Sequence, residues 1–109
     1  MAYDEGLAEL LRETLASETG ISERKMFGGL CFLKDGHMVC GVHQGGGMAR
    51  VGKSAEAEAL TIPGIAPLSF TGRKMGGMVD VSEEVLADDT LRGRIVSMAL
   101  AHAKSLPPK

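Results

Sequence analysis

One stretch of the chain decides the fold: residues 30–43, which read LCFLKDGHMVCGVH. Two apolar runs, 30–34 and 37–43, flank the pair Asp35-Gly36. An Asp-Gly pair between apolar runs favours a two-residue turn of type I′, in which both residues have positive φ. The sequence therefore predicts a β-hairpin centred on this turn.

The turn also sets the register of the hairpin, because a two-residue loop leaves Lys34 opposite His37. Counting outward from that pair, Cys31 lies opposite Cys40. Side chains alternate between the two faces of a strand, so one face is apolar and is expected to face the core. Its residues are Cys31, Leu33, Met38, Cys40 and Val42. The other face is mixed and is expected to be partly solvated, with Leu30, Phe32, Lys34, His37, Val39 and His43.

Helical periodicity marks both ends of the chain. Residues 4–18 place leucines on one side and carboxylates on the other, and Asp4 is the expected N-cap. Apolar residues recur at helical spacing over 91–106, after a cap provided by Ser82 or Asp89.

The middle of the chain adds shorter elements. We expect a strand at 48–51, a short helix at 55–60 capped by Ser54, and two more strands at 68–71 and 75–81. The order is α-β-β-β-α-β-β-α, with hairpin-length connections that favour antiparallel pairing. The sequence therefore predicts one α+β domain over residues 1–109. Its two layers are an antiparallel sheet of about five strands and a layer of helices on one face.

Composition excludes several classes of protein. The chain has 109 residues, of which 44% are hydrophobic and 24% charged, as in one ordinary globular domain. Mean hydropathy is +0.06, and no run approaches the roughly 18 apolar residues that a membrane span needs. The acidic start, MAYDE, is unlike a signal peptide. With two cysteines and no export signal, we expect a cytoplasmic protein that does not bind membranes.

Charge is distributed unevenly along the sequence. Residues 1–23 hold six acids and one base, whereas residues 24–74 hold seven bases and three acids. The strands could therefore carry a basic rim that attracts anions, and the alternative is a solvated edge that prevents aggregation. The candidate binding residues of the rim are Arg24, Lys25, Arg50, Lys53, Arg73 and Lys74.

A second phosphate signal lies at residues 47–54, GMARVGKS, which match the P-loop pattern. In a P-loop Lys53 would reach the terminal phosphates and Ser54 would hold Mg²⁺. Because 48–51 is expected to be a strand and the following helix is short, we expect the match to be accidental.

The two cysteines are candidates for redox chemistry. As predicted neighbours across the hairpin, Cys31 and Cys40 could form a redox-sensitive disulfide, or they could pack as small reduced hydrophobic side chains. A zinc site with His37 or His43 is a weaker alternative, because alternation sends the histidines to the opposite face. We therefore expect no metal.

No catalytic set emerges from the sequence, and we expect neither enzyme activity nor a cofactor. No pattern such as G-x-S-x-G places a nucleophile on a strained turn. His102 lies on the apolar stripe of the last helix, where an interface or core histidine is more common than a general base.

Five segments resemble the TfoX N-terminal domain family of bacteria, over nearly the whole chain. The most specific is KMFGGLCF at 25–32, together with FTGR at 70–73. The others are YDEGL at 3–7, RVG at 50–52 and SLPPK at 105–109. The resemblance implies an α-β-β-β-α-β-β-α two-layer fold, and we expect the chain to be a stand-alone N-terminal domain.

The resemblance also implies a functional class. The namesakes of the family regulate natural competence together with the transcriptional machinery, and no catalytic residues carry over. We therefore expect a regulatory or protein-interaction domain with a protein partner, or a homodimer formed through Leu30, Phe32 and Val39 if that face is uncovered. The first alternative is nucleic-acid or phosphate-ligand binding through the basic rim. The second is a nucleotide-binding enzyme that uses residues 47–54.

Overall fold

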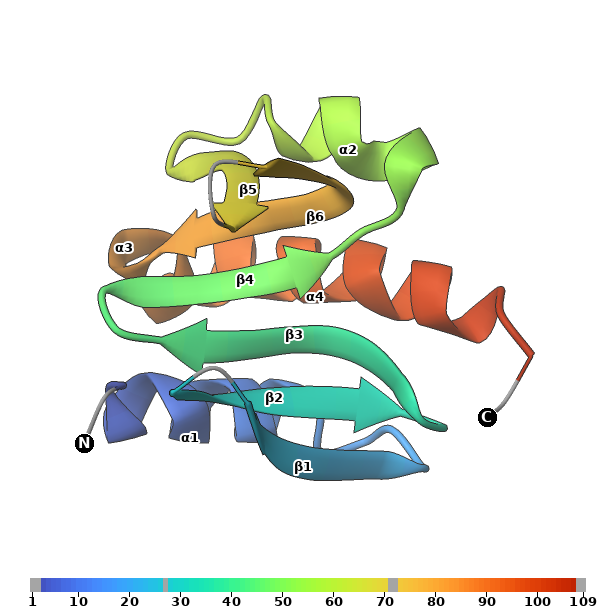
Figure 1. The fold of residues 1–109 in the computed structure, drawn as a ribbon. Helices are drawn as coiled ribbons and strands as arrows, with labels where there is room; N and C mark the ends of the chain where they lie inside the picture. The colour runs from blue at the N-terminus through green and yellow to red at the C-terminus, as the bar shows by residue number, and fades with distance from the viewer. Residues whose placement is uncertain (1–2, 27, 71–72, 108–109) are drawn as a thin grey trace.

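The computed structural model describes residues 3–26, 28–70 and 73–107, with the backbone alone at 69–70 and 73–75. Within these residues six strands form one sheet in the order β1-β2-β3-β4-β6-β5, and every neighbouring pair is antiparallel (Figure 1). The strands are β1 (Ile21–Met26), β2 (Gly29–Lys34), β3 (His37–His43), β4 (Gly46–Arg50), β5 (Ile65–Phe70) and β6 (Arg73–Ser82). The helices are α1 (Glu5–Thr14), α2 (Lys53–Ala59), α3 (Glu83–Ala87) and α4 (Asp89–Lys104).

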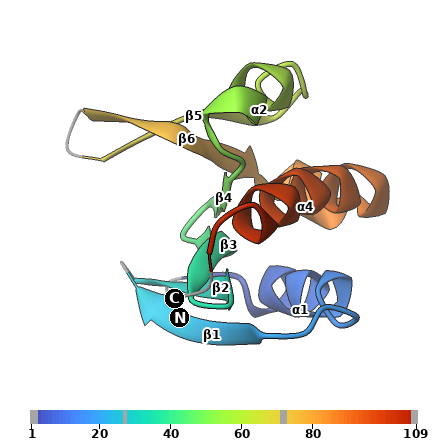
Figure 2. The same ribbon diagram turned by 90° about the vertical axis from the view of Figure 1, so that its right-hand side faces the viewer.

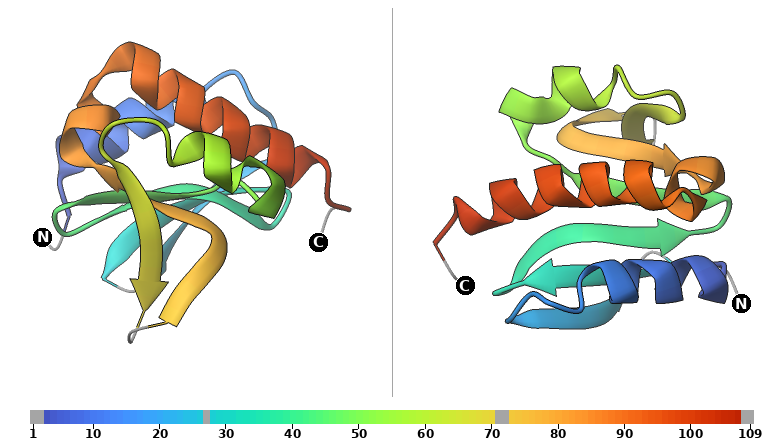
Figure 3. Two further views of the ribbon diagram at one scale, coloured as in Figure 1. Left: turned by 90° about the horizontal axis from the view of Figure 1, so that it is seen from above. Right: turned by 180° about the vertical axis from the view of Figure 1, so that it is seen from behind.

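The helices lie on one face of the sheet. Figure 2 shows α1, α2 and α4 on the same side, and the β5–β6 hairpin projects to the other side. Seen from behind, α4 crosses the middle strands and α1 lies over β1 and β2 (Figure 3). The predicted two-layer α+β class is confirmed, with one strand more than expected. No helix in the described part of the chain is long and apolar enough to cross a membrane.

Strand β1 is one of two elements that the sequence pattern did not predict, and the other is the short helix α3. The residues of β1, ISERKM, are mostly exposed and show no apolar alternation. The strand forms because it pairs with β2 along its whole length and because Arg12 of α1 holds Glu23 with two hydrogen bonds, of 2.6 and 2.9 Å. Both contacts are made with other elements of the fold, so the strand propensity of residues 21–26 does not predict them.

The helix ends follow side-chain capping. Asp4 caps α1 as predicted, accepting hydrogen bonds from two backbone N–H groups. Ser82 caps the short helix α3, and Asp88 instead of Asp89 caps α4. The expectation that Ser54 caps α2 is wrong: Gly52, with φ of 88°, is the N-cap residue.

The central hairpin has the predicted turn but a different register. Asp35 and Gly36 have φ of 50° and 87°, as a type I′ turn requires. Beyond the second pair of residues, however, the register shifts by one, so that Phe32 lies opposite Cys40. Val39 is the extra residue of a β-bulge. The residues of the turn do not predict this bulge.

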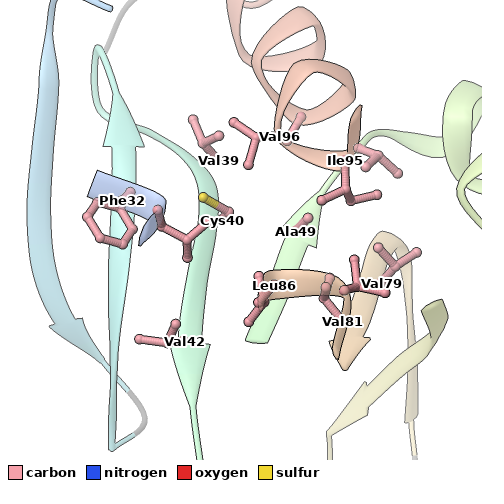
Figure 4. Close-up of a cluster of buried hydrophobic side chains, with 14 of the residues drawn as sticks. Phe32, Val39, Cys40, Val42, Ala49, Val79, Val81, Leu86, Ile95 and Val96 are labelled. Carbon is pink, nitrogen blue, oxygen red and sulfur yellow. The ribbon is translucent and has the colours of Figure 1, made fainter. Parts of the chain in front are cut away.

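The bulge reverses the predicted faces of β2. Leu30, Phe32 and Val39 were expected on a partly solvated face, yet they are buried in the main core under the helices. Figure 4 shows Phe32, Cys40 and Val42 from the hairpin together with Ile95 and Val96 of α4. The homodimer through Leu30, Phe32 and Val39 was expected only if that face were uncovered, and this condition is not met, because the three side chains are buried.

Cys31, Leu33 and Met38 lie on the other face, away from the helices. They belong to a separate apolar cluster that also includes Met48 and Leu68. The two faces of the sheet are thus both partly apolar, but only one is covered by helices (Figure 2).

Candidate functional site

The residues of the predicted basic rim divide into separate groups. Arg24 and Lys25 are on β1, which two strands separate from β4 and Arg50. At about 4.8 Å per strand this places them roughly 14 Å apart in the sheet direction. Arg24 lies opposite Cys31, on the face without helices, whereas Lys25 lies opposite Leu30, on the helix side. The side chains of Arg73 and Lys74 lie outside the described residues.

Arg50 and Lys53 do come together. They line a hollow of 310 Å³ with His102 of α4 and three glycines, Gly52, Gly76 and Gly77. The hollow lies where β4 ends, α2 begins and α4 ends. Residues that are far apart in sequence thus form one cationic depression.

The glycines determine the shape of this hollow. A Cβ on Gly52 would lie 2.5 Å from Nδ1 of His102, and one on Gly77 would lie 3.2 Å from the backbone N of Lys53. The carbonyl of Gly77 accepts hydrogen bonds from the N–H groups of Val51 and Gly52, at 2.9 and 3.0 Å. β6 and the start of α2 therefore pack backbone against backbone, which only residues without side chains permit.

The segment that matches the P-loop pattern does not fold as a P-loop. Gly47–Arg50 form part of β4 and pair with β3 on one side and β6 on the other. The backbone N–H groups of this segment serve a sheet, so they do not curl around a phosphate. The expectation of an accidental match is confirmed for the backbone geometry, although Lys53 still faces the hollow.

A second hollow of 300 Å³ adjoins the first and shares His102. Its wall is mainly apolar, with polar groups at its edge. The lining residues are Val51, Ser54, Ala55, Glu58, Met98, Ala101, His102 and Ser105. His102 thus stands between a cationic and a mostly apolar depression.

The environment of His102 favours its neutral form. Burial lowers the pKa of His102 below its ordinary value of 6.5, and the positive charges of Arg50 and His37 lower this pKa further. The sequence predicted a histidine on an apolar stripe. The structure places it half-buried on the wall of both hollows.

The opposite side of the sheet carries a second candidate surface, which we call the sulfur-rich face. Its inner layer is buried and consists of Cys31, Leu33, Met48 and Leu68. Its outer layer is half-buried and consists of Met26, Met38 and Met78. No helix of the described residues packs on this face (Figure 2; Figure 3, left).

The candidate redox pair is separated by the sheet. Cys31 belongs to the sulfur-rich face and Cys40 to the main core, and both thiols are free. The predicted cross-strand pairing of the two is wrong, because the bulge at Val39 moves Cys40 opposite Phe32. Burial raises the pKa of Cys31, and it raises that of Cys40 to about 12. Among the described residues no group of three or more His, Cys, Asp or Glu could hold a metal ion.

The family model of the TfoX N-terminal domain matches residues 13–103, which is most of the chain. The chain belongs to the TfoX N-terminal domain family. No curated protein and no solved structure matched it in the other two comparisons.

In this TfoX N-terminal domain, reasoning from sequence found one of the two surfaces. It singled out Arg50 and Lys53 as cations of the rim, but it did not connect them to His102. It missed the sulfur-rich face, because the predicted register put Cys31 and Leu33 in the main core. The available signal was that five of the seven methionines fall on strands: Met26, Met38, Met48, Met75 and Met78.

Proposed function

We propose that this domain is a non-catalytic regulatory module that binds an acidic segment of a partner protein on its sulfur-rich face. The observation that carries the proposal is an apolar cluster on a sheet face that the described helices leave uncovered. Large apolar patches on a protein surface commonly mark interaction sites.

The two layers of this face suit a surface whose side chains adjust to the partner. Rigid, buried side chains such as Leu33 and Leu68 lie beneath, and three half-buried methionines lie above them. Methionine is unbranched and polarisable, so it can reshape itself around different apolar partners. A partner that inserts a few apolar side chains would displace little structure and would bury the methionine layer.

Charge indicates the chemistry of the partner. Arg24 lies opposite Cys31, so it shares the face with the sulfur cluster. The carboxylate of Asp80, which lies opposite Met48, is hydrogen-bonded to His43 at 3.0 Å. The segment 24–74 holds seven bases and three acids. An acidic partner segment is therefore electrostatically complementary to the face.

The family supplies a context for this proposal. The resemblance to TfoX regulators implies action alongside transcriptional machinery, and a module that acts by binding suits such a role. A cytoplasmic location belongs to the same proposal, because the two free, buried thiols suit a reducing compartment.

The test compares matched methionine variants. Met38→Gln and Met78→Gln alter the outer layer of the sulfur-rich face, whereas Met98→Gln alters an equally half-buried methionine on α4. Proteins captured from a bacterial lysate by the wild type are identified, purified and titrated against all variants. We expect the double variant to weaken binding by about tenfold or more, and Met98→Gln to change it by less than about twofold.

Direct mapping completes the test. The methyl groups of labelled methionines are followed by NMR as the purified partner is added, and Met26, Met38 and Met78 are expected to shift. Binding that shifts Met98 alone contradicts the proposal. The free domain could instead dimerise as its concentration rises. If Met38→Gln abolished that dimerisation, the face would bind a second copy of the domain, and the proposal of an acidic partner segment would be contradicted.

A further inference from the structure

The hollow beside α2 holds two cations without a counter-ion. Arg50 and Lys53 both line it, and within the described chain neither of them forms an ion pair. Two like charges side by side repel each other, and an anion between them removes that cost. The described lining residues include no carboxylate, although Glu56 accepts the N–H of Gly77, one of the lining residues, at 2.9 Å.

The adjoining hollow offers a more apolar surface beside the two cations. Val51, Ala55 and Met98 give it apolar lining, and Ser54 and Ser105 add hydroxyl groups. The carboxylate of Glu58 also lines it and lies 3.7 Å from the guanidinium of Arg94. His102 forms the shared boundary of the two hollows. A ligand that extends across this boundary would have one anionic end and one neutral, partly apolar end.

We propose that the two hollows together bind a small phosphate monoester. The phosphate lies between Arg50 and Lys53, and the neutral body of the ligand lies against Val51, Ala55 and Met98 in the adjoining hollow. The volumes, 310 and 300 Å³, fall at the lower end of the range of about 300–1,000 Å³ that ligand pockets occupy.

The residue types suit a phosphate. The guanidinium of Arg50 can offer two parallel N–H groups to phosphate oxygens, and the ammonium of Lys53 acts as a point charge. Gly52 and Gly76 line the same hollow and have no side chains that would hold the ligand away from the backbone. The site has no residue in common with the sulfur-rich face, so the two proposals stand or fall separately.

The test uses three probes: phenyl phosphate, inorganic phosphate and phenol. Each is titrated into the ¹⁵N-labelled domain while the backbone signals of residues 50–54 and the ring signals of His102 are followed. We expect saturable binding of phenyl phosphate, about tenfold tighter than that of inorganic phosphate, and no saturation with phenol. Binding of all three with equal affinity overturns the assignment of the phosphate to Arg50 and Lys53.

Matched variants separate a site from general charge attraction. Lys53→Gln removes one positive charge from the hollow, and Lys25→Gln removes the same charge from β1, where Lys25 is exposed and forms no ion pair in the described structure. We expect Lys53→Gln to weaken phenyl phosphate binding by about tenfold and Lys25→Gln by less than about twofold. Equal weakening by both variants, or no saturation up to roughly 10 mM of probe, overturns the proposal. Unchanged backbone spectra confirm that both variants are folded.

Discussion

Cys40 lies opposite Phe32 and not opposite Cys31, because Val39 is an extra residue in β3. The two cysteines are on adjacent strands, but the bulge sends their side chains to opposite faces of the sheet. A difference of one residue in register therefore separates two sulfur atoms that an unbroken hairpin would place side by side.

The first prediction concerns oxidation of these thiols. We expect no disulfide between Cys31 and Cys40 after mild oxidation of the folded domain, because the sheet lies between their side chains. Mass spectrometry without reduction measures the loss of two hydrogens that a disulfide would cause. In urea both thiols become accessible, so oxidation there provides the positive control. A disulfide in the folded protein would contradict the observed register.

The second prediction concerns stability at alkaline pH. Burial raises the pKa of Cys40 from 9.0 to about 12, so its thiol stays neutral in the folded state at pH values where the unfolded chain ionises. The contribution to stability is complete below the unfolded pKa and is lost as the pH rises from about 9 toward 12. The expected slope is at most about 1.4 kcal/mol per pH unit.

Urea denaturation between pH 8 and 11 measures this slope. The Cys40→Ala variant lacks the thiol and is the control, because other groups titrate in the same range in both proteins. We expect the free energy of unfolding to fall less steeply with pH in the variant. Parallel pH profiles of the two proteins would show that Cys40 is not the group responsible.

The third prediction concerns a buried arginine that joins three helices. Arg92 of α4 donates hydrogen bonds to Oγ1 of Thr14, to the carbonyl of Leu86 and to Asp89, at 2.8, 2.9 and 2.6 Å. We expect Arg92→Met to lower the free energy of unfolding by about 2–4 kcal/mol, because partners buried with it lose their donor. Urea denaturation measures the change.

A neighbouring arginine is the matched control for that experiment. Arg94 lies on the same helix with its side chain 50% exposed, and its contact with Glu58 is 3.7 Å long. Exposed ion pairs contribute little, so Arg94→Met is expected to change stability by less than about 0.5 kcal/mol. Equal effects of the two substitutions would argue against the internal role of Arg92.

The fourth prediction contrasts two glycines. Gly93 lies within α4, and a Cβ there would contact nothing within 4 Å. We expect Gly93→Ala to stabilise the domain by about 0.5–1 kcal/mol, because alanine loses less backbone entropy in a helix. Gly77 has φ of 82° and lies against the backbone of Gly52. We expect Gly77→Ala to destabilise the domain by about 1–3 kcal/mol, and thermal denaturation of both variants checks the opposite signs.

The fifth prediction concerns the titration of His102. Burial lowers its pKa below 6.5, and the charges of Arg50 and His37 add to the effect. Because a lowered pKa disfavours the protonated form, the contribution of His102 to stability is complete above pH 6.5 and declines as the pH falls through its folded pKa. We expect Arg50→Gln to raise the pKa of His102 in an NMR titration. Arg24→Gln, on the other side of the sheet, is expected to leave it unchanged.

Much of the fold follows from local chemistry that the sequence displays directly. Asp35-Gly36 forms the predicted turn because both residues tolerate positive φ, and Asp4 caps α1 because its carboxylate reaches the first free N–H groups. The amphipathic runs at the two ends of the chain become α1 and α4, and the short apolar runs become strands. These features depend on neighbours a few residues away.

Tertiary structure alone decided which side chains share a surface. The bulge at Val39 puts Phe32 of β2 on the same face as Cys40 of β3, and β1 becomes a strand through its contacts with β2 and Arg12. The hollow of Arg50, Lys53 and His102 joins residues about 50 positions apart. Pattern and turn chemistry determine the elements because they act within a few residues, whereas packing against distant parts of the chain determines register and the composition of each surface.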